Sequence, residues 1–539
     1  MSEGQEARPF RPAQRQADRS VDLIDIPVGG LLGDRAREHP RRTAIVGVRH
    51  GSDRQERLSY AALLDEATRV AHTLLALTPQ GSHIALWAPN TLEWTIIQYG
   101  AALAGMVLVA LNPVLREDEL EYALTHSGAT VLLHADVSRD YRMDEVAERV
   151  GGRIAGLQRI SLSQNWYACG TGSVALPEVA ADEVAMLQYT SGTTGRPKGV
   201  VLTHRALVNV AKLTLTEAQA PDGAVCVNPL PMFHTAGCVI ATLGPLWLGG
   251  TAVLIDRFTP AAALHTLRAE RPDVLFFVPA ILDALLAAQL AEGAPAPQIP
   301  IVMGGAALVS AALIDGVAEV FGSTVLNLFG QTELAPVLSM TRPGDSREQR
   351  LSTVGRPLPQ VDCKIVDPAT GAVVGVGEPG EICARGYQQF VEYLHDPAAT
   401  AAAVDDDGFV HTGDLGTMDE HGYLRVTGRL KEIIIRGGEN IAPADVEQHL
   451  TGHEAVTDLA VIGIPDDRWG EAVATVFRTV SEPAEVKEHL VAQAQSRLAP
   501  YKVPSRWFVT QQDFPVTPTG KVRKFELREA LLRGEMREL

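Results

Sequence analysis

The 539-residue chain has few cysteines, and none of them stand in a paired pattern. There are five, an odd number, scattered through the sequence without a CxxC pair, which excludes a small protein held together by disulfides. We expect reduced thiols in the core of a cytoplasmic protein. The cysteines are Cys169, Cys226, Cys238, Cys363 and Cys383.

The chain also lacks an excess of positive charge. It carries 47 Lys and Arg against 65 Asp and Glu, a formal net charge of −18. Nucleic acid and anionic membranes both require a basic face, so we exclude them as main partners. An anionic ligand must instead meet a local basic patch. The segment from Arg497 to the end is such a region, with 9 basic and 5 acidic residues.

Long hydrophobic runs are scarce. The first twenty residues carry charges throughout and have no apolar core, so we expect a mobile tail rather than a signal peptide or an anchor. The uncharged stretch 236–255 is long enough to cross a bilayer, but Pro245 and the Gly249-Gly250 pair interrupt it. This stretch predicts a buried helix, a turn and a strand.

The patterns that are present indicate an α/β fold in more than one unit, because the chain is too long for one core. Segments of helical period alternate with β-rich runs at 84–88, 106–111, 130–135, 252–256 and 274–279, which predicts mainly parallel sheets. After about Leu351, short strands at 361–367, 380–386 and 422–429 predict an antiparallel or barrel-like subdomain. A last unit begins near Lys431, with strands around 433–437 and 459–465 and helices at 443–451 and 484–497.

The most informative segment is TSGTTGRPKG, residues 190–199. Its glycines let backbone N–H groups approach a phosphate, its hydroxyls add donors, and Lys198 adds charge. It predicts a phosphate-binding loop, but no Walker A pattern can be drawn through it. A G-x-G-x-x-G run at Gly375–Gly380 is a decoy, because Pro379 and a following strand replace the helix that a dinucleotide site needs.

This loop resembles the signature of the adenylate-forming superfamily, which contains acyl-CoA synthetases, non-ribosomal adenylation domains and luciferases. Six further blocks of the chain are similar to family motifs and follow in the family's order. They are PMFHTAG (231–237), GGAAL (304–308), FGQTE (329–333), HTGD (411–414) with GRLKEIIIRGG (428–438), and PVTPTGK (515–521). Two segments depart from the pattern, Gln360 and residues 387–400, and we expect both to lie outside the chemical motifs.

The resemblance implies a fold of two domains. A large N-terminal domain, residues 21–429, would hold two mainly parallel sheets flanked by helices, with a β-rich subdomain at about 351–429. A small mobile α+β domain, residues 430–539, would rotate about a hinge near Lys431. Residues 1–20 would be a disordered tail.

The resemblance also implies a reaction that joins a carboxylic acid to ATP. Attack of the carboxylate on the α-phosphate gathers negative charge, so placed cations and hydroxyls should supply most of the rate. The catalytic residues implied are Lys521 as the central cation, Glu333 as the Mg²⁺ ligand, Thr332 toward the α-phosphate, and His234. The ATP or AMP contacts implied are Thr190, Ser191, Gly192, Thr193, Thr194, Gly195, Lys198, Gly305, Ala306, Phe329, Gly330, Asp414 and Arg429, with the last two on the ribose.

A second step would transfer the acyl group to the thiol of coenzyme A. By resemblance, the residues toward coenzyme A are Arg436, Gly437, Gly438 and Glu439. The acyl pocket implied consists of His234, Thr235, Val239, Val278, Met303, Gly304, Leu334 and Pro336. Residues 235–237 are small, and no aspartate lies near this segment to pair with an α-amino group, so an acid with an uncharged tail is favoured over an amino acid.

The sequence therefore predicts an ATP-dependent carboxylic acid–CoA ligase acting on a fatty, alicyclic or aryl acid. Two alternatives stay open: a ligase that loads an acyl carrier protein, and a non-catalytic sensor that binds an acyl group or adenylate on the same fold. A homodimer is also left open. The acid itself cannot be read from the residue types.

Overall fold

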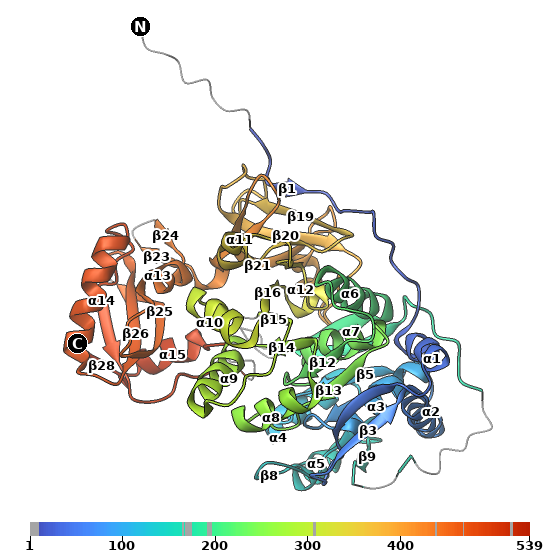
Figure 1. The fold of residues 1–539 in the computed structure, drawn as a ribbon. Coiled ribbons are helices and arrows are strands. Elements are labelled where there is room, and N and C mark those ends of the chain that lie inside the picture. Colours follow the sequence, from blue (N-terminus) through green and yellow to red (C-terminus); the bar gives the residue numbers. More distant parts are fainter. Residues whose placement is uncertain are drawn as a thin grey trace. The chain divides into compact units, whose positions relative to one another are not determined.

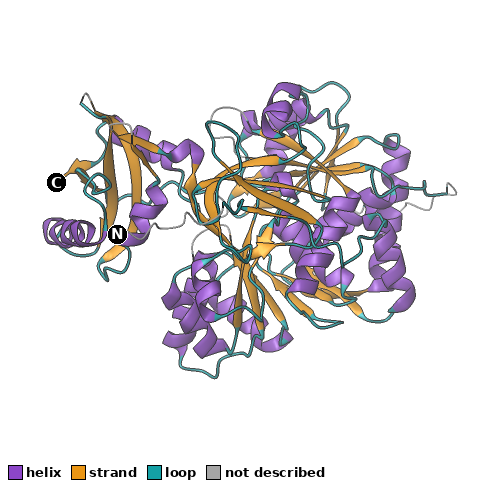
Figure 2. Ribbon diagram, turned by 90° about the horizontal axis from the view of Figure 1, so that it is seen from above, coloured by secondary structure: helices purple, strands orange, loops and turns teal. Residues whose placement is uncertain are grey.

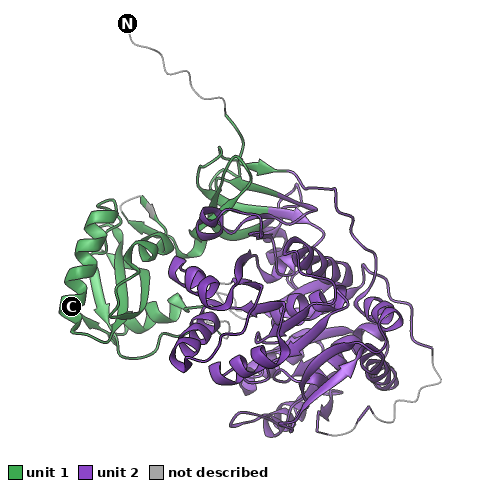
Figure 3. Ribbon diagram, in the orientation of Figure 1, with its two compact units in different colours: residues 1–15, 363–383, 411–539 green, residues 16–362, 384–410 purple. Residues whose placement is uncertain are grey.

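The structure is a computed structural model that describes residues 10–163, 166–167, 175–190, 197–305, 309–436, 439–466, 468–517 and 521–539. The chain divides into two compact units, coloured separately in Figure 3. Unit 1 comprises residues 1–15, 363–383 and 411–539, and unit 2 comprises residues 16–362 and 384–410. The domain boundary near residue 429 stays a prediction.

The larger sheet of unit 2 has nine strands (Figure 1). Six neighbouring strands, from β16 to β2, run parallel, and antiparallel strands flank them at both ends. This confirms the predicted, mainly parallel arrangement. In spatial order the strands are β18 (Arg356–Pro357), β17 (Ser339–Met340), β16 (Thr324–Phe329), β15 (Ile301–Gly305), β14 (Val274–Phe277), β12 (Val225–Asn228), β13 (Thr251–Leu254), β2 (Thr43–Val48) and β3 (Gln55–Ser59).

The second sheet of unit 2 has six strands, and only the β10–β11 pair is antiparallel. In order they are β11 (Lys198–Thr203), β10 (Val184–Thr190), β5 (Val107–Leu111), β4 (His83–Trp87), β6 (Val131–His134) and β9 (Gln158–Ser161). A separate small hairpin joins β7 (Val137–Ser138) to β8 (Tyr141–Arg142).

Helices cover the nine-stranded sheet on both faces. Val46, Val253 and Leu275 belong to a core that α8, α9 and α10 complete, whereas the neighbouring Ile45 and Ala252 face α2, α3 and α7. This alternation follows from the two-residue period of a strand. The helices of unit 2 are α1 (Val28–Glu38), α2 (Tyr60–Leu77), α3 (Leu92–Leu103), α4 (Glu117–Ser127), α5 (Met143–Gly151), α6 (His204–Glu217), η1 (Ala236–Ile240), α7 (Ala241–Trp247), α8 (Pro260–Glu270), α9 (Pro279–Glu292), α10 (Ala311–Phe321), η2 (Thr332–Leu334), α11 (Arg347–Ser352) and α12 (Pro397–Ala403).

Local chemistry fixes where these helices begin and end. The Ser310 hydroxyl accepts the N–H of Leu313 at the start of α10, and Gly322 ends that helix in the left-handed conformation. Helix α8 begins in the same way, because Thr259 accepts the N–H of Ala262 and Pro260 occupies the first turn.

A five-stranded sheet has most of its residues in unit 1, and its outer strand pairs are antiparallel. Its strands are β1 (Gln14–Arg15), β19 (Val361–Val366), β20 (Gly380–Gly386), β21 (Val410–Met418) and β22 (Leu424–Arg429). Strand β20 follows the decoy glycine run directly, as expected. The predicted tail of residues 1–20 differs from the structure, because Gln14 pairs with Lys364 and Ala13 is fully buried. Backbone pairing therefore orders part of that segment.

The remaining sheet of unit 1 packs helices on both faces, as the colours of Figure 2 show. Helices α13 and α14 pack on Val461 and Val473, and α15 packs on Ile462 and Ala474. The strands are β24 (Glu439–Ile441), β23 (Ile434–Arg436), β26 (Gly470–Thr479), β27 (Arg506–Val509) and β28 (Arg537–Glu538), with β25 (Val456–Asp466) also pairing with β26. The helices are η3 (Leu430–Glu432), α13 (Pro443–Leu450), α14 (Pro483–Arg497) and α15 (Lys524–Leu532).

The uncharged stretch 236–255 folds as predicted, into the short helices η1 and α7, a turn and strand β13. Among the helices that the structure describes, none has the length and apolar character to cross a membrane. Cys226, Cys238, Cys363 and Cys383 are buried in the core, as expected, and Cys169 lies outside the described residues.

Candidate active site

The predicted acyl-pocket residues gather at one edge of the nine-stranded sheet. This carboxyl edge is the set of positions where the adjacent parallel strands β12, β14, β15 and β16 end. Ligands of α/β sheets bind at the carboxyl ends of the strands, so this placement suits a binding site. His234, Thr235 and Val239 follow β12, Val278 follows β14, Met303 and Gly304 end β15, and Leu334 and Pro336 follow β16.

Glycines at the carboxyl edge are required by close backbone contacts. A Cβ atom on Gly304 would lie 2.0 Å from the carbonyl oxygen of Phe277, and one on Gly305 would lie 2.0 Å from that of Leu328. A Cβ atom on Gly330 would lie 2.1 Å from the carbonyl oxygen of Pro336. The glycines predicted to face the nucleotide are therefore also needed to pack the strands.

The segment around His234 is held by local bonds and packs against the second sheet. The Nδ1 atom of His234 accepts the N–H of Ala236 at 3.1 Å. Cys238 lies 3.8 Å, sulfur to sulfur, from Met186 in β10, the strand that leads into the phosphate-binding loop. Thr235 is fully buried, and its hydroxyl has no hydrogen-bond partner among the described residues.

The two ends of the predicted phosphate-binding loop face each other across an antiparallel pair. Thr190 at the end of β10 is opposite Lys198 at the start of β11. The Lys198 ammonium lies 4.4 Å from the centre of the Tyr393 ring, within reach of a cation–π contact. The predicted loop residues Ser191, Gly192, Thr193, Thr194 and Gly195 lie outside the described residues, as does Ala306.

Glu333, the predicted metal ligand, is buried and held by Tyr393. The Tyr393 hydroxyl donates to Oε1 of Glu333 at 2.7 Å, and the Phe390 N–H donates to the Glu333 carbonyl at 2.9 Å. Burial, and then the neighbouring carboxylate, raise the pKa of Tyr393, so its hydroxyl stays protonated as a donor. The segment 387–400 departs from the family pattern and lies outside the motif blocks in sequence, but its Tyr393 contacts the predicted metal ligand.

The Glu333 carboxylate fits a magnesium ion. It is 9% exposed, and among the described residues no cation forms an ion pair with it. Mg²⁺ prefers one or two carboxylates together with phosphate oxygens. Thr332 and Glu333 lie in η2, directly after the strand that ends at Phe329.

The predicted ribose contacts form an ion pair in unit 1. Asp414 in β21 is directly opposite Arg429 in β22, and Nε of Arg429 lies 2.8 Å from Oδ1 of Asp414. Asp414 is only 3% exposed, and burial raises the pKa of its carboxyl, while Arg429 and Lys521 oppose that rise. Opposite charges on paired strands are a favourable cross-strand contact.

Lys521, the predicted central cation, interacts with the same pair. Burial and the nearby Arg429 lower the pKa of its ammonium, and Asp414 and Glu432 partly offset that change. Its backbone N–H donates to the Thr517 hydroxyl at 3.1 Å, and its carbonyl accepts the Thr517 N–H at 2.7 Å. We call Asp414, Arg429 and Lys521 the charged cluster.

The residues predicted to face coenzyme A lie on the hairpin of β23 and β24. Arg436 ends β23, Glu439 begins β24, and Gly437 and Gly438 between them lie outside the described residues. Sequence reasoning missed the aromatic neighbours of this hairpin. The Arg436 guanidinium lies 5.8 Å from the ring of Trp469, which is 42% exposed, and donates to the Tyr501 carbonyl at 2.6 Å. The predicted hinge residue Lys431 is exposed in η3.

A cavity of about 310 Å³ elsewhere in unit 2 is not part of this site. It is lined by His83, Val107 and Val184, at the amino ends of their strands, and by residues of the adjoining segments. None of the predicted site residues lines it.

Comparison with known proteins agrees with this geometry. Residues 32–394 match the family model of AMP-binding enzymes, and residues 445–521 match that of the AMP-binding enzyme C-terminal domain. YngI of Bacillus subtilis (strain 168), which is named as an acyl-CoA synthetase, is 34% identical over 94% of this chain and 98% of its own. The mitochondrial medium-chain acyl-CoA ligase ACSF2 of Rattus norvegicus is 30% identical over 96% of this chain and 89% of its own.

A solved structure matches the fold. It is the o-succinylbenzoate CoA synthetase MenE of Bacillus subtilis in complex with the acyl-adenylate intermediate OSB-AMP. It superposes with a TM-score of 0.80 at 28% identity, over 94% of this chain and 99% of that one.

The chain therefore belongs to the AMP-binding enzyme family. The resemblance to adenylate-forming enzymes is confirmed, and relatives named acyl-CoA synthetases or ligases assign the chain to that branch of the superfamily.

Proposed function

We propose that this enzyme is an ATP-dependent carboxylic acid–CoA ligase that works in two steps. The carboxylate first attacks the α-phosphate of ATP, forming an acyl-adenylate and releasing pyrophosphate. The thiol of coenzyme A then attacks the acyl carbon, forming a thioester and releasing AMP. The observation that carries the proposal is the charged cluster, in which the ammonium of Lys521 and the ribose-binding candidates Asp414 and Arg429 interact within one unit.

Charge placement supports the first step. The ammonium of Lys521 stabilises the negative charge that develops as the carboxylate oxygen bonds to the α-phosphate, and Thr332 donates a hydrogen bond to that phosphate. Mg²⁺ bound with ATP would supply further positive charge, and Glu333 is the residue that would hold it. Tyr393 orients the Glu333 carboxylate, and Lys198 contributes charge at the end of the phosphate-binding loop.

The hairpin of β23 and β24 supports the second step. Coenzyme A carries phosphates and an adenine ring, which a guanidinium and an aromatic face can both contact. Arg436 and the exposed Trp469 offer those two groups side by side. This pairing favours coenzyme A over a carrier protein as the acceptor.

The acyl side supports an acid with an uncharged tail. Val239, Met303 and Leu334 are fully buried at the carboxyl edge and offer apolar surface. Thr235, four residues before Val239, has a buried hydroxyl with no hydrogen-bond partner among the described residues, and this hydroxyl suits a carboxylate oxygen of the substrate. We propose a fatty, alicyclic or aryl acid.

The test measures pyrophosphate release from ATP across a panel of short, medium, long, aromatic and alicyclic acids. Each acid is assayed alone, with coenzyme A and with an acyl carrier protein that bears phosphopantetheine. We expect release with at least one acid and a thioester with coenzyme A.

The other outcomes separate the alternatives. Pyrophosphate release with a thioester on the carrier protein alone would support the carrier-loading ligase. Binding of an acyl-AMP analogue without pyrophosphate release from any acid would support the non-catalytic sensor.

A further inference from the structure

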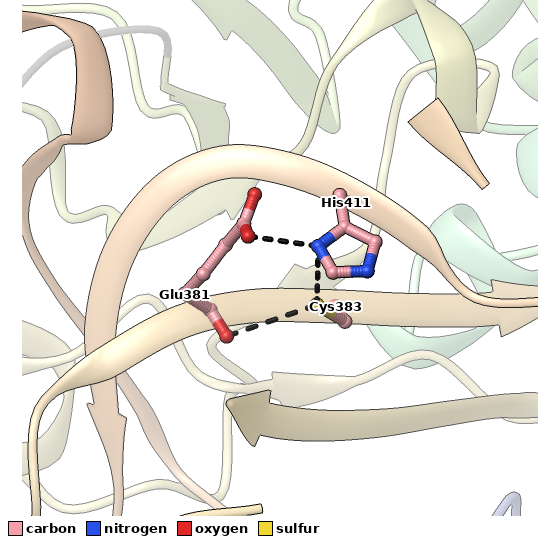
Figure 4. Close-up of side chains that lie close together, drawn as sticks. All are labelled: Glu381, Cys383 and His411. Carbon is pink, nitrogen blue, oxygen red and sulfur yellow. Dashed lines mark hydrogen bonds and ion pairs between the residues drawn. The ribbon is translucent and has the colours of Figure 1, made fainter. Parts of the chain in front are cut away.

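The turn that presents Asp414 is bonded to Glu381, a residue outside the motif blocks quoted above. Glu381 lies in β20, the neighbour of β21, and its side chain is directed toward His411 (Figure 4). Glu381 is only 6% exposed. A buried carboxylate needs partners for its charge, so its contacts show what it does.

Both oxygens of the Glu381 carboxylate are bonded to the turn. Oε1 accepts the N–H of Gly413 at 2.9 Å, and Oε2 lies 2.8 Å from Nδ1 of His411. An ionised carboxylate only accepts, so the His411 Nδ1–H is the donor. Glu381 thus holds the turn at two points, immediately before Asp414.

The turn needs this support because its backbone is irregular. Gly413 has a φ of 70°, in the left-handed region that favours glycine, although it lies within strand β21. The Thr412 hydroxyl adds a third bond by donating to the Ile382 carbonyl at 2.7 Å, and it accepts the Asp414 N–H at 3.1 Å. Strand β20 therefore fixes the backbone from which the Asp414 side chain projects.

Glu381, Cys383 and His411 also offer one ligand atom each within 4.8 Å of one another, a spacing that could hold a metal ion. The bonds on both carboxylate oxygens favour a different role. We propose that Glu381 is a positioning residue that fixes the turn 411–414, so that the Asp414 carboxylate meets both Arg429 and the ribose of ATP. This inference rests on the proposed function.

The test compares ATP with 2′-deoxy-ATP, because a displaced Asp414 loses its contact with the ribose hydroxyls specifically. The readout is the ratio of kcat/KM for the two nucleotides in ATP–pyrophosphate exchange, with the best acid of the panel. A site that bonds a hydroxyl rejects an analogue without it, so we expect wild type to prefer ATP by about tenfold or more. Glu381→Ala should reduce this preference to about threefold or less.

Two variants and a control separate positioning from stability. Glu381→Gln keeps an oxygen for the Gly413 N–H, and its amide N–H can donate to Nδ1 of His411 when the imidazole proton is on Nε2. It should therefore restore the preference to within about threefold of wild type. Thr412→Val removes the hydrogen bond from the Thr412 hydroxyl to the Ile382 carbonyl and should also lower the preference for ATP. It therefore tests the same role if Glu381→Ala does not fold. Asp345→Ala is the control, because Asp345, like Glu381, is 6% exposed and accepts a backbone N–H through its carboxylate. It should leave the preference for ATP unchanged.

An unchanged preference in folded Glu381→Ala and Thr412→Val would overturn the positioning role. A stoichiometric metal ion in wild type that Glu381→Gln loses would overturn it as well. Wild type without pyrophosphate exchange for any acid would instead contradict the proposed function, so the two failures are distinguishable.

Discussion

The carboxyl edge and the charged cluster are built in different ways. At the carboxyl edge, glycines and buried apolar side chains are fixed by close contacts between parallel strands. In the charged cluster, Arg429 and Lys521 oppose the rise in the pKa of Asp414, and Arg429 helps to lower the pKa of Lys521. Asp414 and Arg429 lie on paired antiparallel strands, and Lys521 follows a turn. The difference indicates that the first region provides shape and the second provides charge. Substitutions at the edge should act through stability, and those in the cluster through rate.

The greatest expected effect comes from Lys521→Ala. Removing the central cation should lower the rate of adenylation by about 10³-fold, because placed charge often supplies most of the rate enhancement in such a reaction. Thioester formation from supplied acyl-AMP should stay within about tenfold of wild type, because the new bond in that step forms at the acyl carbon and not at the α-phosphate. Single-turnover assays of each step measure both effects. Equal losses in both steps would refute the proposal that Lys521 acts in adenylation and not in thioester formation.

The carboxyl edge should respond to Gly305→Ala through stability. The added Cβ atom would collide with the Leu328 carbonyl, so the free energy of unfolding should fall by about 3 kcal/mol. Gly33→Ala is the matched control, because Gly33 lies within helix α1 with open space around it. It should raise the free energy of unfolding by about 0.5–1 kcal/mol. Urea titrations measure both changes, and equal midpoints for the two variants would contradict the role given to Gly305.

The charged cluster should also set the pH dependence. Burial lowers the pKa of Lys521, so it should lose its proton at a lower pH than an ordinary lysine. Adenylation needs the charged form, and its rate should therefore fall by about tenfold per pH unit as pH rises above that pKa. Lys521→Arg should move this alkaline limb to higher pH, because a guanidinium keeps its proton. If the adenylation rate falls at the same alkaline pH in wild type and in Lys521→Arg, the fall is due to the titration of another group.

Tyr393→Phe tests whether a residue at the carboxyl edge also orients a charged group, the Glu333 carboxylate. Loss of the hydroxyl leaves the ring for Lys198 but removes the bond to Glu333, so the Mg²⁺ concentration for half-maximal activity should rise about tenfold. Tyr141→Phe is the control, because its hydroxyl also donates, to the Leu115 carbonyl, and Arg116 lies over its ring. It should leave the Mg²⁺ requirement unchanged. An identical requirement in both variants would refute the role of Tyr393.

The smallest expected effect lies at Gln360, away from both regions. Gln360 has a φ of 65°, a conformation that costs an L-residue about 1 kcal/mol. Both Gln360→Ala and Gln360→Gly remove the bond from Nε2 to the Val21 carbonyl, so their difference in stability isolates the backbone strain. Gln360→Gly should be more stable than Gln360→Ala by about 1 kcal/mol in thermal or urea unfolding. An alanine variant of equal stability would show that the backbone carries no strain.

Local patterns predicted much of the fold. The Gly249-Gly250 pair correctly marked the turn between a helix and a strand in the stretch 236–255, whereas Pro245 lies inside α7. The strand expected at 380–386 is β20. The contacts that could not be predicted join distant residues with no local signal. Tyr393 bonds to Glu333 across 60 residues, and Glu381 bonds to His411 across 30. Glu333 and His411 could be identified because they lie in family motifs. Their partners Tyr393 and Glu381 could not, because those contacts depend on which strands become neighbours in the fold.

The pairing of β1 with β19 has a consequence for the order of folding during synthesis. Gln14 pairs with Lys364, so 350 residues separate the two partners. At about 5–20 residues per second, a ribosome would need roughly 20–70 s to make the second strand after the first. Most of unit 2 has been synthesised by then, so its sheets can form first, and β1 stays unpaired until β19 has been made. A pulse-labelling experiment on stalled nascent chains would detect protection of β1 only after β19 has emerged.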